Sequence, residues 1–254
     1  MFQRTLIFCL FVMLPSLTQS QPLRIAVASN FAVPLARLID HYQQASPEGA
    51  DISVSIGSTG KLYAQITRGA PFDLFFAADT ERPQRLVRAG LTAGPEKIYT
   101  VGRLALYHPK SKTADGLEAQ LSNSPRIAMA NPKLAPYGLA AQQTLQALNW
   151  QPAPSNLILT LENVGQTWAS VASGNAAVGF VSLSQLQQQG AAASAFTLVP
   201  TSLHDPIAQA AVVLQSSHAL AEAKAFLAFV RQQSGTSASG AALDPAILQS
   251  VNGP

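Results

Sequence analysis

A regular alternation of short apolar stretches with amphipathic ones is the feature that most constrains the fold of this 254-residue chain. Stretches typical of β-strands are expected at residues 23–28, 51–56, 73–77, 98–107, 126–130, 156–161, 177–181 and 207–214. Helical periodicity is found at residues 31–42, 61–68, 81–89, 138–148, 165–172, 219–232 and 235–243. This alternation predicts α/β sheets with ligand loops at the carboxyl ends of the strands. The long β-like stretch at 98–107 separates two such series, which indicates two lobes.

Residues 1–20 have the layout of a secretory signal peptide. Arg4 is their only charge, an apolar run covers residues 6–14, and the small residues Thr18 and Ser20 precede a cleavage point directly after them. A membrane anchor is the alternative, but the run is too short to span a bilayer, which needs about 20 residues. We therefore expect this segment to be removed and the mature protein to work in the periplasm.

Removal of this segment also simplifies the composition. Cys9 is the only cysteine, and without Arg4 the formal net charge falls from +3 to +2. The mature chain then has no disulfide, and a periplasmic protein of this size buries enough core to fold without one. Its small basic excess contains no cluster of Lys and Arg, which argues against nucleic-acid binding. About 234 residues remain, enough for one large or two small domains.

The turn from Ile56 to Leu62, with the sequence IGSTGKL, joins an alternating strand to a helix. It places two hydroxyls and two glycines at a helix N-terminus, where free backbone N–H groups and the helix dipole favour an anion. A phosphate-binding P-loop is excluded because Ser55 stands where its first glycine is needed, and Leu62 where its magnesium-binding hydroxyl is needed. An oxyanion site built from neutral donors fits this turn better.

Three other strand-to-helix junctions carry polar or aromatic residues. Ser29 and Asn30 lie at the first junction, Tyr137 at the third, and Asn163 and Val164 at the fourth. Each has an ordinary structural interpretation, because Ser and Asn are preferred helix caps, and a tyrosine there can pack against the core. When Asn163 caps its helix, however, the N–H of Val164 is free to point outward. Each junction alone is therefore ambiguous between a helix cap and a ligand site.

Taken together and in order, these junctions resemble the periplasmic molybdate-binding protein of ATP-binding-cassette importers. The segments that carry the resemblance are 25–31 (IAVASNF), 57–66 (GSTGKLYAQI), 70–79 (APFDLFFAAD), 131–132 (NP) with 136–138 (PYG), 162–164 (ENV) and 177–182 (AVGFVS). No single segment is specific, but the ordered set extends over nearly the whole mature chain.

The resemblance implies the fold of a class II periplasmic binding protein. Such a protein has two α/β lobes joined by a two-strand hinge and holds a tetrahedral oxyanion in the cleft between them. Lobe I would comprise residues 21–102 plus 208–254, and lobe II residues 103–207. Closure of the hinge would bring donors from both lobes onto one ligand.

Position by position, the resemblance implies a set of neutral ligand donors from both lobes: Ser29, Asn30, Ser58, Thr59, Tyr137 and Val164. Thr59 matches a serine of the family and keeps its hydroxyl, whereas Tyr137 and Val164 match positions that contact the ligand through backbone N–H groups. Ser182 is a further candidate, because some relatives have a tyrosine ligand there. Serine is shorter than tyrosine, so the phenol of Tyr137 is the alternative source of that contact.

The chemistry of such a donor set suits molybdate and tungstate. Near neutral pH these dianions carry no proton and present only acceptor oxygens, which N–H and O–H groups at helix N-termini can bind. Monohydrogen phosphate is disfavoured, because its proton needs an acceptor that a donor-only cleft lacks. Sulfate has the right charge but is smaller, so the size of the cleft must reject it.

The implied function is capture of molybdate, and of tungstate, for delivery to an inner-membrane ABC permease with its ATPase. The oxyanion is cargo, so neither a cofactor nor a further metal is expected, and we expect the protein to act as a monomer. A binding protein for another tetrahedral oxyanion, such as sulfate, is the main alternative.

An enzyme is poorly supported by the sequence. The four histidines are scattered and show no metal-ligand spacing. His204 and Asp205 could form part of a catalytic triad, but no Gly-x-Ser-x-Gly motif accompanies them. A periplasmic hydrolase that uses Ser182 or His204 is therefore the least supported of the three hypotheses.

Overall fold

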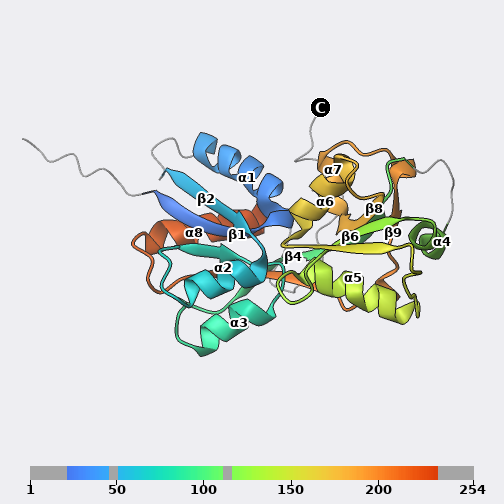
Figure 1. Cartoon of the computed structure of the whole chain (residues 1–254). Helices are drawn as coiled ribbons and strands as arrows, with labels where there is room; N and C mark the ends of the chain where they lie inside the picture. The colour runs from blue at the N-terminus through green and yellow to red at the C-terminus, as the bar shows by residue number, and fades with distance from the viewer. Residues whose placement is uncertain (1–21, 46–50, 111–115, 234–254) are drawn as a thin grey trace, which may run out of the picture.

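The computed structural model describes residues 22–45, 51–110 and 116–233. Over these residues the chain forms two five-stranded sheets with helices packed against them, and the sheets define two lobes that lie side by side (Figure 1). The predicted two-lobed α/β fold is confirmed. The predictions of a signal peptide at residues 1–20 and of a helix at 235–243 fall outside the described residues.

Lobe I is built on a mixed sheet with the strand order β2-β1-β3-β10-β4. β1 (Leu23–Ala28) lies between β2 (Ile52–Gly57) and β3 (Leu74–Phe76) and is parallel to both. β10 (Ile207–Val213) is antiparallel to β3 and to the edge strand β4 (Lys97–Gly102). A strand from late in the chain therefore completes a sheet that the first part of the chain begins.

Helices cover both faces of this sheet. One face carries the 3-10 helix η1 (Ser29–Phe31), α1 (Ala32–Ala45) and α8 (Leu220–Gln233), and the other carries α2 (Thr59–Ile66) and α3 (Glu81–Arg88) (Figure 1). Alternate side chains of a strand point to opposite faces, so a central strand covered on both sides must be apolar throughout. This explains the nearly continuous apolar sequence of β1.

Lobe II is built on a second mixed sheet with the strand order β7-β6-β8-β5-β9. β6 (Arg126–Ala130) is parallel to β7 (Leu157–Leu161) and to β8 (Val178–Ser182). β5 (Leu104–Tyr107) is antiparallel to β8 and to the edge strand β9 (Phe196–Leu198). The two sheets thus share one plan, a parallel part extended by antiparallel strands.

Two longer helices, α5 (Pro136–Ala147) and α6 (Val164–Ala172), pack against the sheet of lobe II. Four shorter helical segments complete the lobe: α4 (Leu117–Ser122), α7 (Leu183–Gln188), η2 (Ala193–Ala195) and η3 (Thr201–Leu203). The start of α5 lies so close to β6 that a Cβ atom at Gly138 would overlap the Ala130 carbonyl group. Only glycine allows this approach, which fixes the position of the first turn of α5.

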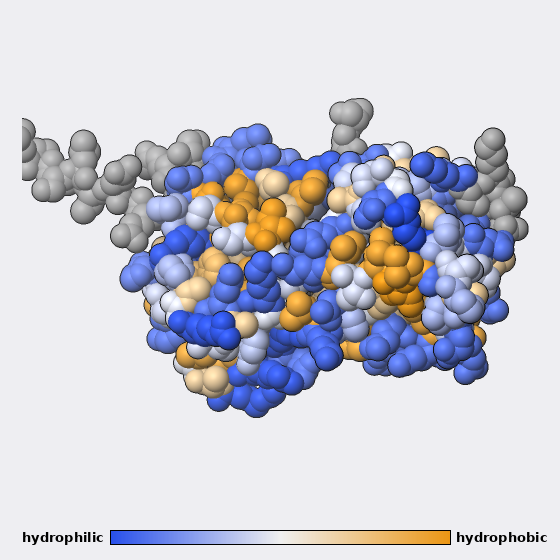
Figure 2. Space-filling model, in the orientation of Figure 1, coloured by the Kyte–Doolittle hydropathy of each residue, from blue (hydrophilic) through white to orange (hydrophobic). Residues whose placement is uncertain are grey.

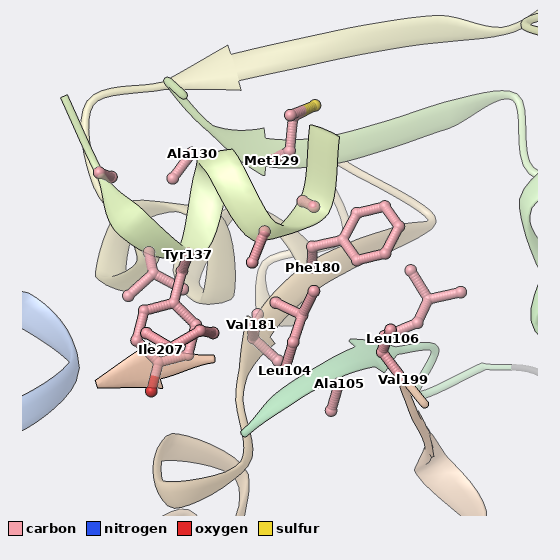
Figure 3. Close-up of a cluster of buried hydrophobic side chains, with 14 of the residues drawn as sticks. Leu104, Ala105, Leu106, Met129, Ala130, Tyr137, Phe180, Val181, Val199 and Ile207 are labelled. Atoms are coloured by element: carbon pink, nitrogen blue, oxygen red, sulfur yellow. The ribbon is translucent and has the colours of Figure 1, made fainter. Parts of the chain in front are cut away.

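The core of lobe II brings several of these elements together (Figure 3). Leu104 and Leu106 from β5 pack with Phe180 from β8, and Tyr137 projects into the same cluster from the first turn of α5. All four side chains are buried. The aromatic ring of Tyr137 therefore has a packing role in the core, whatever else the residue does.

The predicted single strand at residues 98–107 is wrong, because the structure divides it between the two sheets. β4 ends at Gly102, and β5 begins at Leu104 in the other lobe. Both halves pair within a sheet and both are rich in apolar residues, so the sequence contains no break where the chain changes lobes. The return crossing lies between β9 and β10. These two crossings form the hinge, while the lobe limits at 102/103 and 207/208 remain a prediction.

Hydrophobic surface lies on both lobes in the view of Figure 2. Among the exposed large apolar side chains are Val54 and Ile56 on β2 and Leu157 on β7, two strands that form sheet edges. Within the described ranges, no helix is long and apolar enough to cross a membrane.

Candidate functional site

The four strand-to-helix junctions singled out in the sequence meet in two pairs, and each pair joins the lobes. At the first pair, the backbone N–H of Gly165 in α6 donates to Ser29 Oγ over 3.2 Å. At the second pair, the backbone N–H of Gly60 in α2 donates to the carbonyl oxygen of Leu134, just before α5, over 2.8 Å. The candidate site residues are therefore gathered where the two lobes touch.

The first junction follows β1 and supplies Ser29 and Asn30. Ser29 Oγ accepts the bond from Gly165, which leaves its hydroxyl hydrogen available for another acceptor. Asn30 is only 3% exposed, and its Nδ2 donates to Gln209 Oε1 over 2.8 Å. One amide hydrogen of Asn30 is thus held by the protein, which fixes the orientation of this side chain.

The second junction follows β2 and supplies Ser58 and Thr59, both buried. Ser58 is the N-cap of α2 and accepts a bond from the backbone N–H of Lys61 over 3.4 Å. Thr59 Oγ1 accepts a bond from the backbone N–H of Ala78 over 3.1 Å, which ties α2 to the loop after β3. Both hydroxyls act as acceptors toward the protein and keep a hydrogen that they can donate.

The third junction follows β6 and places Tyr137 in the first turn of α5, one residue after Pro136. The first N–H groups of a helix have no partner within it, so the N–H of Tyr137 is a donor that α5 does not use. The Tyr137 hydroxyl lies 3.4 Å from Gln209 Nε2, and burial raises the pKa of this phenol. It therefore stays protonated across the physiological pH range.

The fourth junction follows β7 and begins α6 at Val164. Asn163 is the N-cap, and its Oδ1 accepts a bond from the backbone N–H of Gln166 over 3.0 Å. The backbone N–H of Gly165, the second residue of the helix, donates to Ser29 Oγ. Val164 is the first residue of the helix, so α6 itself offers no partner for its N–H.

Ser182 lies at the end of β8 and caps α7. Its Oγ accepts a bond from the backbone N–H of Gln185 over 3.3 Å, and its hydroxyl donates to Gln185 Oε1 over 3.0 Å. Gln209 and, to a smaller extent, Ser182 oppose the burial-driven rise of the Tyr137 pKa. Ser182 is fully buried, and a direct contact between it and a ligand remains a prediction.

Two ion pairs lie near these contacts. Lys61 Nζ lies 2.9 Å from Glu162 Oε2 of the other lobe, and this bond lowers the pKa of Glu162. Arg82 pairs with Asp79 and also donates to the carbonyl oxygen of Lys133 over 2.9 Å. Burial raises the pKa of Asp79, although Arg82 opposes that shift. The contact region therefore presents mainly neutral donors.

Sequence reasoning missed two residues that the structure adds to this region, Gln209 and Leu134. Gln209 contacts both Asn30 and Tyr137, and the carbonyl oxygen of Leu134 accepts a bond from the Gly60 N–H of α2. One signal for Gln209 was available, because it is a lone amide within an apolar stretch. No local pattern could have identified the Leu134 carbonyl, since any residue would supply it.

Two α/β lobes joined by two crossings, with helix N-termini of both lobes meeting between them, define a protein of the two-lobed solute-binding class. The family model "Bacterial extracellular solute-binding protein" matches residues 23–239, and the chain belongs to this family.

Relatives with a known ligand agree with the predicted resemblance. The chain is 35% identical over 223 residues to the molybdate-binding protein ModA of Azotobacter vinelandii, covering 86% of this chain and 87% of that protein. It is also 35% identical over 208 residues to ModA of Rhodobacter capsulatus, covering 81% of each. The solved structure of the periplasmic molybdate-binding protein of Azotobacter vinelandii matches with a TM-score of 0.77 at 31% identity, covering 90% of this chain and 97% of that one. The resemblance to periplasmic molybdate-binding proteins is confirmed.

Proposed function

We propose that this protein binds molybdate, and tungstate, between its two lobes in the periplasm and delivers the anion to an ABC permease. The observation that carries the proposal is the meeting of four strand-to-helix junctions across the lobes, each with neutral donors. The relatives named for molybdate binding, which match most of the chain, support the identity of the anion.

The donors that we assign come from both lobes. Lobe I supplies the Ser29 hydroxyl, the backbone at Asn30, and the hydroxyls of Ser58 and Thr59. Lobe II supplies the backbone N–H groups of Tyr137 and Val164, the two donors that α5 and α6 leave unused. Because each is a donor and none is charged, the dianion is balanced by oriented dipoles rather than by a counter-ion.

This donor set also supports a preference among oxyanions. A fully deprotonated MO4 dianion satisfies every donor, whereas monohydrogen phosphate would bring a proton without an acceptor to receive it. Sulfate has the same charge in a smaller ion, so its bonds to donors on two lobes would be longer. We infer that the protein binds molybdate and tungstate most tightly, sulfate less tightly and phosphate most weakly.

The proposed role is to bind and release the anion without changing it chemically. The anion is cargo, and the protein requires neither a cofactor nor a second metal for it. A hydrolase gains no support from the candidate nucleophile and base. Ser182 is buried in a capping box, and His204 Nδ1 lies 2.7 Å from the backbone oxygen of Asp205 rather than against its carboxylate. Release to a permease and its ATPase, from a monomeric protein, completes the proposed role.

Thermal unfolding of anion-stripped protein with added molybdate, tungstate, sulfate or phosphate tests the proposal. A ligand at about 1,000 times its dissociation constant adds about 4 kcal/mol of stability, which raises Tm by on the order of 10 °C for a chain of this size. A shift with molybdate and tungstate alone supports the proposal. A larger shift with sulfate transfers the assignment to the alternative oxyanion, and no shift with any of the four anions rejects it.

A further inference from the structure

Gln209 is an amide in a strand of otherwise apolar residues, and it is only 2% exposed. It lies on β10, directly after the second chain crossing, and the pairing of β10 with β4 shifts register between Gln209 and Ala210. A buried amide without hydrogen bonds would cost stability, so its partners indicate why the position is polar.

The partners of Gln209 come from both lobes. Its Oε1 accepts the bond from Asn30 Nδ2 over 2.8 Å and lies 3.1 Å from the Tyr99 hydroxyl, which is also 3.1 Å from the Ala77 carbonyl oxygen. Its Nε2 donates to the Tyr137 hydroxyl over 3.4 Å. Asn30 belongs to the first junction of lobe I and Tyr137 to the third junction, in lobe II. A single side chain therefore holds one proposed ligand residue from each lobe.

The space around this network is tightly filled on the side of the hinge. A Cβ atom at Gly102, the last residue of β4, would overlap the Tyr137 hydroxyl and would lie 2.8 Å from Gln209 Nε2. The first chain crossing therefore packs directly against Gln209 and Tyr137. On its open side the network borders a small cavity of about 80 Å³, which Asn30, Tyr137 and Gln209 help to line.

We infer that Gln209 is a positioning residue for anion capture, which fixes Asn30 of lobe I and Tyr137 of lobe II in register from the hinge between them. This inference rests on the proposed function. Gln209 does not touch the anion. Its amide anchors the Asn30 side chain and the Tyr137 hydroxyl, and through them the backbone of the first junction and of the first turn of α5, so the donors at the two junctions face one ligand when the lobes close. Preorganisation of this kind strengthens binding because less order must be created on ligand capture.

The amide is suited to this role because it donates and accepts at once. Methionine has a similar length and flexibility but neither capacity, so Gln209→Met removes all three contacts while filling most of the space. Such a change leaves the buried Asn30 amide without its partner. We expect the dissociation constant for molybdate to rise about tenfold or more, the effect of losing at least one buried hydrogen bond.

The experiment separates positioning from simple stabilisation. Molybdate affinity is measured by titration calorimetry on folded protein expressed from residue 21, and lobe closure by energy transfer between dyes at Arg68→Cys and Gln146→Cys. Both labelled positions are exposed, one on each lobe, and the only natural cysteine, Cys9, is absent from this protein. A merely structural role would lower Tm with and without molybdate but leave the affinity of the folded protein unchanged.

A matched control is Thr144→Val, which removes the hydroxyl of a fully buried residue of lobe II. Thr144 Oγ1 donates to the carbonyl oxygen of Ala140 over 2.8 Å, within α5 and outside the Gln209 network. We expect this variant to lose stability while binding molybdate as the wild type does. Tyr137→Phe, which removes only the hydroxyl that Gln209 contacts, gives the same test should Gln209→Met fail to fold.

The possible outcomes test the positioning role of Gln209 separately from the proposed binding of molybdate. Weaker molybdate binding by Gln209→Met or Tyr137→Phe, with altered energy transfer in the loaded state and normal binding by Thr144→Val, supports the inference. Affinities within about twofold of the wild type for both network variants overturn it and leave the proposed function intact. A wild-type protein that binds no molybdate overturns the proposed function, and the positioning role falls with it.

Discussion

The two lobes share one sheet plan but contribute different chemistry to the candidate site. In the proposed site, lobe I contributes mainly side chains, the hydroxyls of Ser29, Ser58 and Thr59, beside the backbone at Asn30, whereas lobe II contributes backbone N–H groups, at Tyr137 and Val164. A side-chain donor depends on residue identity. A backbone donor depends instead on where a helix begins. The donors of lobe II could therefore be supplied by many different side chains, provided that the helices begin at the same positions. Substitutions should therefore act differently on the two lobes.

The largest expected effect concerns the geometry of lobe II. Gly138→Ala places a Cβ atom onto the Ala130 carbonyl group, so the first turn of α5 must move away from β6 and carry the Tyr137 N–H with it. We expect a loss of about 3 kcal/mol in the free energy of unfolding, together with loss of molybdate binding. Urea unfolding and calorimetric titration measure the two effects. Gly116→Ala, at a glycine with open space around it, is the control and should bind normally.

Removal of a single backbone donor is the next test of the comparison. Val164→Pro deletes one N–H at the first helical position, where proline is tolerated, and Asn163 before it already has the extended φ of −148° and ψ of 168° that proline requires. We expect binding to weaken by about 2–3 kcal/mol, one bond to a charged ligand, with α6 intact by circular dichroism. Val164→Ala keeps the N–H, and its affinity should match that of the wild type. Equal weakening by both variants would mean that the side chain matters and the backbone does not.

A side-chain donor of lobe I should show the opposite dependence on residue identity. Thr59→Ala removes a buried hydroxyl and is expected to weaken molybdate binding by about 1–2 kcal/mol, whereas Thr59→Ser should retain most of the affinity. Calorimetric titration of the three proteins measures this. Since Thr59 also accepts the Ala78 N–H, a lower Tm is expected for Thr59→Ala. An affinity unchanged by the alanine substitution would remove Thr59 from the site.

The smallest effect is expected at the charged pair between the lobes. Lys61 lowers the pKa of Glu162, so the pair contributes stability above the unfolded-state pKa of the carboxyl, and the contribution is lost as pH falls through the lower folded-state pKa. Both side chains are partly exposed, so Glu162→Gln should cost at most about 1 kcal/mol. Thermal unfolding from about pH 7 down to about pH 2, below the lowered pKa of Glu162, should show the Tm values of the two proteins converging at the acid end. A difference in Tm that persists in acid would mean that it does not arise from the Lys61–Glu162 ion pair.

Much of the fold followed from local patterns. β1 and α1 could be located because apolar periodicity reports burial, and the Ser58 turn could be recognised because hydroxyls and glycines are unusual between a strand and a helix. The short helix α7 was missed because its sequence, LSQLQQ, is polar and too brief to show a period. The break at Arg103 was missed because burial in either sheet gives the same apolar pattern.

The residues of the candidate site could be predicted from the sequence, but the contacts between them could not. The four junctions were visible because each combines a strand end with cap residues, yet their pairing depends on contacts between residues far apart in the chain. The bond between Gly165 and Ser29 joins lobe II to lobe I, and no local rule predicts it. The sequence pattern places Gln209 in a strand but does not identify its partners, because only the tertiary structure supplies them.

The bond from the Gly60 N–H to the Leu134 carbonyl oxygen has a consequence for transport. It lets the N-terminus of α2 be satisfied by the protein's own backbone, so the two lobes can meet without cargo. Water can replace such a bond, whose net worth is about 1 kcal/mol, so this contact alone holds the lobes together only weakly. Under the proposed function, an anion that bonds to donors of both lobes would lengthen the lifetime of the shut form, and that lifetime would distinguish a loaded receptor from an empty one.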